Sequence, residues 1–100
     1  MPLPPFLEPV SENDPDFGKA IEEVYSSAMG EGTLDKKTKL LIALAVDAVN
    51  GATQGVANIA RQLKDMGVSD EEIREALRIA YFASGNSILA SYAAAFPCGE

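Results

Sequence analysis

Residues 34–51, with the sequence LDKKTKLLIALAVDAVNG, decide the fold. Asp35 is a good N-cap residue and Asn50-Gly51 is a typical stop, so this stretch predicts a single helix. Between residues 40 and 49 the only charged residue is Asp47. A helix that is apolar on nearly every face is buried on nearly every face. In a chain of 100 residues, we therefore expect either the central helix of a bundle or a helix buried by a partner subunit.

Two further helices flank this one in the sequence. Asp14-Pro15 is a helix start, because a carboxylate can cap free amides and proline suits the first helical position. The apolar spacing that follows continues until Gly30. After the central stretch, residues 53–66 again carry apolar residues at helical spacing, and Gly67 is a typical C-terminal stop. Both segments are therefore predicted to be helices.

The C-terminal third of the chain predicts two more helices. Ser69 and Glu72 form a capping box at the start of the first. Gly85-Asn86-Ser87 interrupts the apolar pattern, so we expect a separate last helix over Ile88–Ala95. No alternating strand pattern of useful length is present. The predicted fold is therefore all-α, a bundle of about five helices.

The N-terminal residues 1–15 differ from the rest in composition, because they hold five of the six prolines. Proline lacks an amide proton and restrains its predecessor to extended conformations, so we expect an irregular arm. The arm also carries apolar residues. It therefore either packs on its own domain or a neighbouring subunit, or forms a disordered terminus. Residues 16–100 are expected to form a single helical domain.

Composition excludes several classes of function. The net charge is −7, which repels phosphate backbones, so we expect no nucleic-acid partner. The chain has no histidine and one cysteine, so zinc sites of the Cys/His type and Ser-His-Asp triads are excluded, and we expect no metal and no cofactor. We also expect no membrane-spanning segment and no secretory signal, and hence a cytoplasmic protein.

Residues 33–96 resemble the carboxymuconolactone decarboxylase family, which includes the alkyl hydroperoxidase D-like proteins. The similarity is carried by residues 34–46, by Asn50-Gly51, by Met66-Gly67-Val68, and by residues 69–77, SDEEIREAL. It implies the all-α alkyl hydroperoxidase D-like fold. It also implies a homo-oligomer, a trimer or a hexamer.

The redox branch of that family carries a Glu, a Cys-x-x-Cys motif and a His. The corresponding positions here are Leu40, Ala52, Gly55 and Ile59. None of these side chains is a nucleophile or titrates, and the one thiol, Cys98, lies far away in sequence without a resolving partner. We therefore predict that peroxidase and disulfide-reductase activity by the family mechanism are absent.

The decarboxylase branch of the family is similar in the segment 81–85, which reads YFASG here. Its histidine is also missing, so the acid or cation that lactone chemistry needs would come from Asp47, Arg61 or Tyr81. These three are weak catalytic candidates. We expect Asp47 to pair with Arg61 or a lysine, or to reach solvent at a subunit boundary. Tyr81 is expected in the core or in an interface.

The four replaced positions predict an apolar patch where the redox branch has a titratable pocket. Either neighbouring side chains close this patch into a core, or a small apolar ligand fills it. The residues that would line such a pocket are Gln54, Val56 and Asn58. Three functions therefore stay open: an oligomeric small-molecule binder, a structural or interaction subunit without a ligand, and a lactone-acting enzyme with unrecognised residues.

Overall fold

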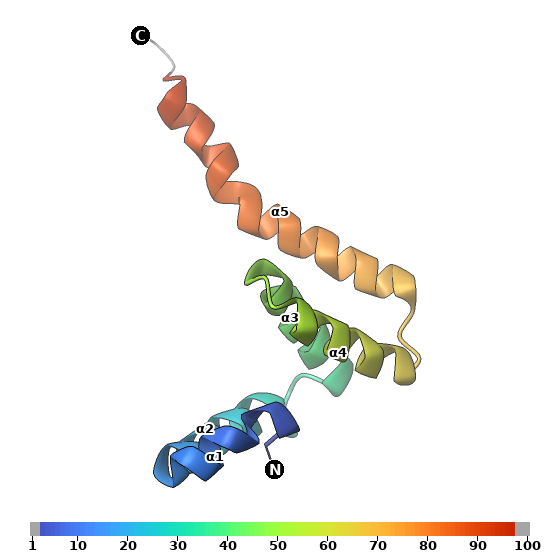
Figure 1. The fold of residues 1–100 in the computed structure, drawn as a ribbon. Coiled ribbons are helices and arrows are strands. Elements are labelled where there is room, and N and C mark those ends of the chain that lie inside the picture. Colours follow the sequence, from blue (N-terminus) through green and yellow to red (C-terminus); the bar gives the residue numbers. More distant parts are fainter. Residues whose placement is uncertain (1–2, 98–100) are drawn as a thin grey trace. The chain divides into compact units, whose positions relative to one another are not determined.

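The computed structural model describes residues 3–97 and is all-α over that range, which confirms the predicted fold class. The chain divides into two compact units, one ending at Lys36 and the other beginning at Lys37. The division lies just before the apolar part of residues 34–51. The boundary predicted from the sequence was instead at residue 15, between an N-terminal arm and a helical domain. Figure 1 shows the helices of both units.

The first unit is a pair of short helical segments followed by a longer helix. It contains a 3-10 helix, η1 (Pro5–Leu7), and the helices α1 (Glu8–Asn13) and α2 (Pro15–Met29). The expectation of an irregular arm was therefore wrong. Prolines fall in the first turns of η1 and α1, where the missing amide proton leaves no helical hydrogen bond unmade.

The predicted start of α2 is confirmed. The backbone amide of Phe17 donates to the Asp14 carboxylate at 3.4 Å, and Pro15 occupies the first helical position. One turn later, Gly18 is buried against α1, because a Cβ built on it would lie 2.5 Å from Ser11 Cα. Glycine at this position therefore permits the close packing of α1 on α2.

The second unit contains α3 (Lys36–Val49), α4 (Thr53–Asp65) and α5 (Asp70–Ala95). Both predicted glycine stops are confirmed, since Gly51 and Gly67 have φ angles of +75° and +87°. At the end of α4, the amides of Gly67 and Val68 donate to the carbonyls of Lys64 and Leu63 at 2.9 and 3.0 Å. These bonds satisfy carbonyls that the end of a helix leaves free.

The hydrophobic core lies between α3, α4 and the first half of α5. Its buried members are Leu40, Leu44, Leu63, Val68, Ile73 and Ala80. Of the two alternatives that its composition predicted, α3 is not the central helix of a bundle, and burial by a partner subunit stays a prediction. Ile42, Val46 and Val49 are all at least half exposed, so α3 presents an apolar face that other described residues of the chain do not cover.

The capping box at the start of α5 is confirmed, and it also connects α5 to α3. The Glu72 amide donates to Ser69 Oγ at 3.1 Å, and the Ser69 amide donates to the Glu72 carboxylate at 3.2 Å. The same carboxylate forms an ion pair with Lys37 in the first turn of α3. The Lys37 ammonium and then the Ser69 amide lower the pKa of Glu72 below its usual value of 4.5.

α5 is one continuous helix of 26 residues, so the expected break at Gly85-Asn86-Ser87 was wrong. A glycine in a helix costs about 1 kcal/mol relative to alanine, and asparagine and serine cost less. Such losses weaken a helix without ending it. The first half of α5 packs on the core, and Figure 1 shows the second half continuing past α3 and α4.

Replacing Gly18 with alanine is expected to destabilise the α1–α2 pair by about 1–3 kcal/mol, because backbone must move to admit the new methyl group. Chemical denaturation followed by circular dichroism measures this loss. Lys19→Ala, at the exposed neighbouring position, is the control and should leave the free energy of unfolding nearly unchanged. An equal effect of both substitutions would contradict the close packing at Ser11.

Glu72→Gln is expected to lower stability at pH 7 more than at pH 3. Because folding lowers the pKa of Glu72, its carboxylate stabilises the folded state above pH 4.5, and this contribution is lost as the pH falls through the lowered pKa. Denaturation midpoints measured between pH 3 and pH 7 test this. Glu75→Gln, which removes an exposed carboxylate from the same helix, is the matched control. Its difference in stability from the wild type should not shrink between pH 7 and pH 3 as that of Glu72→Gln does.

Candidate functional site

The connection between α3 and α4 brings Asp47 against Gly55. Asp47 lies in the last turn of α3 and Gly55 in the first turn of α4. A Cβ built on Gly55 would overlap Asp47 Oδ2 and lie 3.1 Å from Asp47 Cγ. The carboxylate therefore occupies the space that a side chain at position 55 would need.

The Asp47 carboxylate also lies at the N-terminal end of α4, where a helix favours negative charge. Ala52, the N-cap residue, has no side-chain oxygen to accept from the amides of the first turn. Asp47 is half-buried and forms no ion pair with any residue between 3 and 97. Of the two expected alternatives, pairing with Arg61 or a lysine is therefore not found, and contact with solvent at a subunit boundary stays a prediction. Favourable interaction with the helix end provides a physical reason for a lone carboxylate here.

The structure brings only some of the four replaced family positions together. Ala52, Gly55 and Ile59 follow one another along α4; Ala52 is exposed, and the other two are half-buried. Leu40 is in the core at 4% exposure. It lies nine residues, or about 14 Å along the helix, before the end of α3, whereas Ala52 comes after that end, at the start of α4. Leu40 and Ala52 therefore do not belong to one pocket.

The residues that were predicted to line a pocket do not enclose one. Gln54 and Asn58 are exposed and hydrogen-bonded to each other, with the Gln54 amide donating to Asn58 Oδ1 at 3.1 Å. Val56 is half-buried, and Arg61 is exposed farther along α4. The space next to Gly55 is filled by the Asp47 carboxylate. A neighbouring side chain thus fills the space at Gly55, as in one of the two expected alternatives, but the group that does so is a carboxylate and not hydrocarbon.

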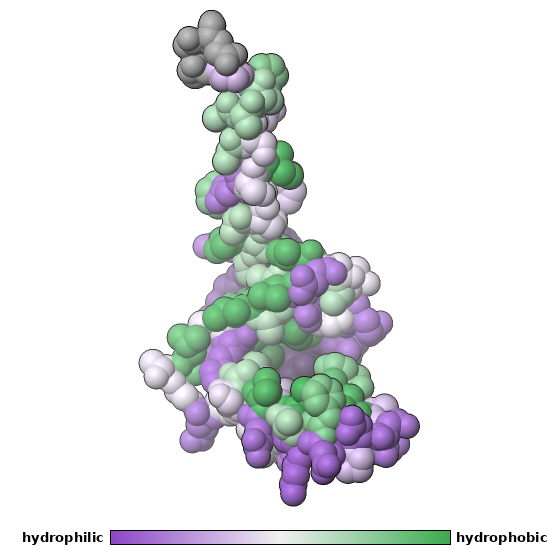
Figure 2. Space-filling view, turned by 90° about the vertical axis from the view of Figure 1, so that its left-hand side faces the viewer, coloured by the Kyte–Doolittle hydropathy of each residue, from purple (hydrophilic) through white to green (hydrophobic). Residues whose placement is uncertain are grey.

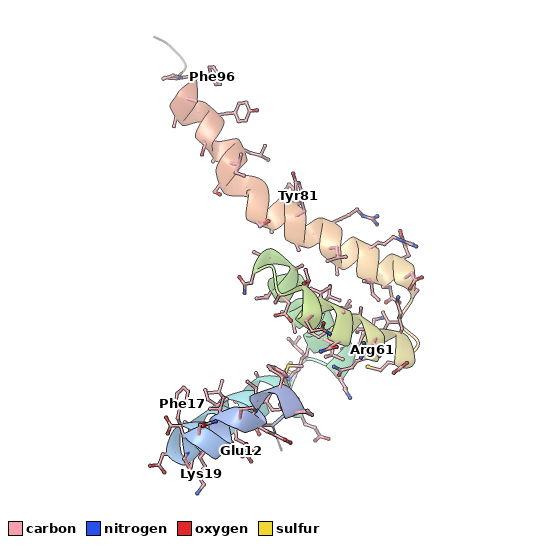
Figure 3. The ribbon with its side chains drawn as sticks, in the orientation of Figure 1. Glu12, Phe17, Lys19, Arg61, Tyr81 and Phe96 are labelled. Atoms are coloured by element: carbon pink, nitrogen blue, oxygen red, sulfur yellow. The ribbon has the colours of Figure 1, made fainter. Side chains whose placement is uncertain are left out.

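The three weak catalytic candidates come from three different helices. Tyr81, on α5, is 82% exposed, so of the two expected placements it does not take the one in the core, and the one in an interface stays a prediction. Tyr81 borders a shallow hollow that Ala48 and Val49 of α3 also line, and Figure 3 shows its side chain projecting outward from α5. Asp47 instead lies against the start of α4. Tyr81 and Asp47 therefore do not converge on one reacting group within this chain.

A groove lies between α3 and α5. It has a volume of about 410 Å³ and is open to solvent, within the range of ligand sites. Its lining residues are Leu41, Ile42, Ala45, Glu72, Glu75, Ala76 and Ile79. Alanines at positions 45 and 76 leave space between the two helices, and isoleucines form the walls.

Charge is confined to one side of the groove. Glu72 is held by Lys37 and Ser69, whereas Glu75 is exposed and forms no ion pair with any described residue. The sequence prediction did not include this groove, because the positions of the family's redox site lie elsewhere in the chain. One signal could have indicated it. Ile42 with Ala45, and Ala76 with Ile79, are isoleucine–alanine pairs spaced by three residues, so each pair lies on one face of its helix.

Within residues 3–97, no group of three or more histidine, cysteine, aspartate or glutamate side chains could hold a metal ion. In the same range, no helix has the length and apolar character needed to cross a membrane. Cys98, the one thiol of the sequence, lies outside the described residues.

Comparison with known proteins identifies the family of this chain and a relative. Residues 15–96 match the carboxymuconolactone decarboxylase family. An uncharacterized protein of Methanocaldococcus jannaschii is 30% identical over 79 residues, which is 79% of this chain and 74% of the relative. No solved structure matches significantly. The family match spans both units of the chain, including α2 and all of α5.

The Asp47–Gly55 contact predicts that alanine at position 55 acts differently in two backgrounds. Alanine favours a helix over glycine by about 1 kcal/mol, so Gly55→Ala should stabilise the Asp47→Ala variant by that amount. With Asp47 present, the new methyl group displaces the carboxylate and the gain is lost. Free energies of unfolding for the four proteins of this double-mutant cycle test the coupling.

Ala57→Gly provides the matched control, because position 57 is exposed on the same helix. Its cost of about 1 kcal/mol should be the same with and without Asp47. Additivity of the Asp47 and Gly55 substitutions would show that the carboxylate does not occupy this space.

Proposed function

Because this chain belongs to the carboxymuconolactone decarboxylase family, we propose that it is a member without the redox centre, which assembles with copies of itself and binds a small apolar molecule between α3 and α5. The observation that carries the binding proposal is the open groove of about 410 Å³ with walls of leucine, isoleucine and alanine. Its size and lining suit a compact hydrocarbon or ring system.

The absence of peroxidase activity follows in this proposal from the side chains at the four family positions. Leu40 is buried hydrocarbon, and Ala52, Gly55 and Ile59 offer neither thiol nor imidazole. The carboxylate that lies against Gly55 is Asp47, and a carboxylate alone cannot undergo the thiol oxidation on which that mechanism depends. The proposal therefore places binding, rather than redox chemistry, at the centre of the function.

The rim of the groove suggests the polarity of the ligand. Two carboxylates, Glu72 and Glu75, lie on the side formed by α5. Glu72 is already engaged by Lys37, and Glu75 is available to accept hydrogen bonds. We therefore expect a ligand with an apolar body and a neutral donor or an amine, and we expect apolar carboxylic acids to be repelled.

A second candidate function is that of an interaction subunit that binds no small molecule. The second half of α5 favours it, because this segment is exposed although it has no charged side chain after Arg78. Catalysis on a lactone by unrecognised residues has weaker support, since Asp47, Arg61 and Tyr81 come from different helices and do not converge within one chain.

A thermal-shift screen tests ligand binding. The probes are octylamine, octanoic acid, a small quinone and a small lactone. A ligand at 100 times its dissociation constant stabilises a protein by about 2.7 kcal/mol, so a binder should raise the midpoint by several degrees. Of the four probes, octylamine is expected to give the largest rise in the midpoint, and octanoic acid is expected to give none.

The groove itself is tested by Ala76→Phe, which places a ring between α3 and α5 and should abolish the shift. Ala57→Phe, at an exposed position of α4, adds the same ring elsewhere and should preserve it. No shift with any probe would contradict ligand binding and favour the interaction subunit. A shift that survives Ala76→Phe would place the ligand elsewhere.

A further inference from the structure

The second half of α5 carries an apolar face that nothing in the described chain covers. We define the α5 stripe as Tyr81, Phe82, Gly85, Ile88, Leu89, Tyr92 and Phe96. Steps of three and four residues place all of its members on one side of the helix. Its six large side chains are 61–82% exposed. Figure 2, which shows another side of the molecule, draws the second half of α5 mostly in green and white, the colours of apolar and neutral residues.

The α5 stripe continues a face that is charged in the first half of the helix. Arg74 and Arg78 lie on the same side, one and two turns before the stripe. Both lie near Glu71, with shortest nitrogen–oxygen distances of 3.9 and 3.4 Å. After Arg78 there is no charged side chain up to Pro97. A helix face that changes from charged to aromatic in this way marks an interaction surface that begins at residue 81.

Gly85 lies in the middle of the stripe, and nothing within its own chain explains it. It lacks a positive φ angle, and a Cβ built on it would meet no atom within 4 Å. Glycine weakens a helix relative to alanine, so retaining it here needs another reason. Close approach of a second backbone to the open side of Gly85 would provide one.

The area of the α5 stripe suits a stable association. At about 200 Å² for a large side chain, six side chains exposed by about two thirds present roughly 800 Å². This is what each partner contributes to a specific interface of standard size. A second copy presents an identical stripe, and a twofold interface joins the same surface patch on both subunits.

We infer that two copies of the chain associate through the α5 stripe, with the helices antiparallel and crossing at Gly85. This inference rests on the assembly part of the proposed function and specifies its surface. The crossing places Tyr81 of one copy opposite Leu89 of the other, and Phe82 opposite Ile88.

The same register explains the charged start of this face. It places Arg78 of one copy opposite Tyr92 of the other, and Arg74 opposite Phe96. Guanidinium groups bind favourably over aromatic rings. A parallel arrangement would instead bring Arg78 of one copy next to Arg78 of the other, and the two cations would repel each other. Charge therefore selects the antiparallel direction.

Cysteine cross-linking tests the surface and its direction in the full-length Cys98→Ser protein. Tyr81→Cys combined with Leu89→Cys should give disulfide-linked dimers under mild oxidation. Tyr81→Cys alone should not, because in an antiparallel pair the two copies of position 81 lie about 12 Å apart along the helices. Ser87→Cys, on the opposite side of α5, is the negative control. Dimers from Tyr81→Cys alone, or from Ser87→Cys, would overturn the proposed register.

Native mass measurements separate this inference from the assembly proposal. Leu89→Asp buries a carboxylate in the interface and should weaken association roughly 100-fold or more. Ser87→Asp carries the same charge on the other side and should leave the mass unchanged. Circular dichroism checks that both variants keep their helix content.

Three outcomes would overturn the inference. If the wild-type protein assembles and Leu89→Asp leaves its mass unchanged, the surface is wrong although the assembly proposal stands. A wild-type monomer at micromolar concentration contradicts both. If Ser87→Asp dissociates the protein as fully as Leu89→Asp, the association does not depend on the stripe. In each case ligand binding in the groove is tested independently by the thermal-shift screen.

Discussion

The contact between α3 and the first half of α5 is the constraint on which the second unit depends. Leu44 and Leu63 are fully buried beside it, and the Lys37–Glu72 ion pair joins the beginnings of the two helices. Because α5 is one continuous helix, fixing its first half also fixes the direction of its second half. The groove forms along the same contact, where alanines on both helices leave space that their larger neighbours surround.

Signals that act within one turn of the chain predicted the helix ends well. Asp14, Gly67 and the Ser69–Glu72 box bond to backbone or side-chain groups a few residues away, so their residue types alone determine the geometry. The N-terminal arm and the last helix were predicted wrongly for one common reason. Proline in a first turn and glycine within a long helix reduce helix stability only slightly when the neighbouring hydrogen bonds persist. The residue types alone do not show whether those hydrogen bonds persist.

Sequence could predict only part of the candidate site. It identified Gly55 as unusual within α4, and it identified Asp47 as the sole charge of the apolar stretch in α3. It treated them as separate features, because their contact depends on how the turn at Gly51 directs α4 back along α3. The groove was missed for a similar reason: its walls come from α3 and α5, which are more than twenty residues apart in sequence. Pairings of this kind depend on packing rather than on local pattern.

The unbroken course of α5 has a thermodynamic consequence. One rigid helix carries Ala76 and Ile79 in the wall of the groove and, from Tyr81 onward, the residues exposed on its outer side. A shift of this helix that improves the fit on one side is transmitted to the other. If the groove takes a ligand and the outer side of α5 takes a second copy, as proposed, any factor by which the ligand changes the affinity between subunits equals the factor by which association changes the affinity for the ligand. Ligand binding would then be coupled to the quaternary state of the protein.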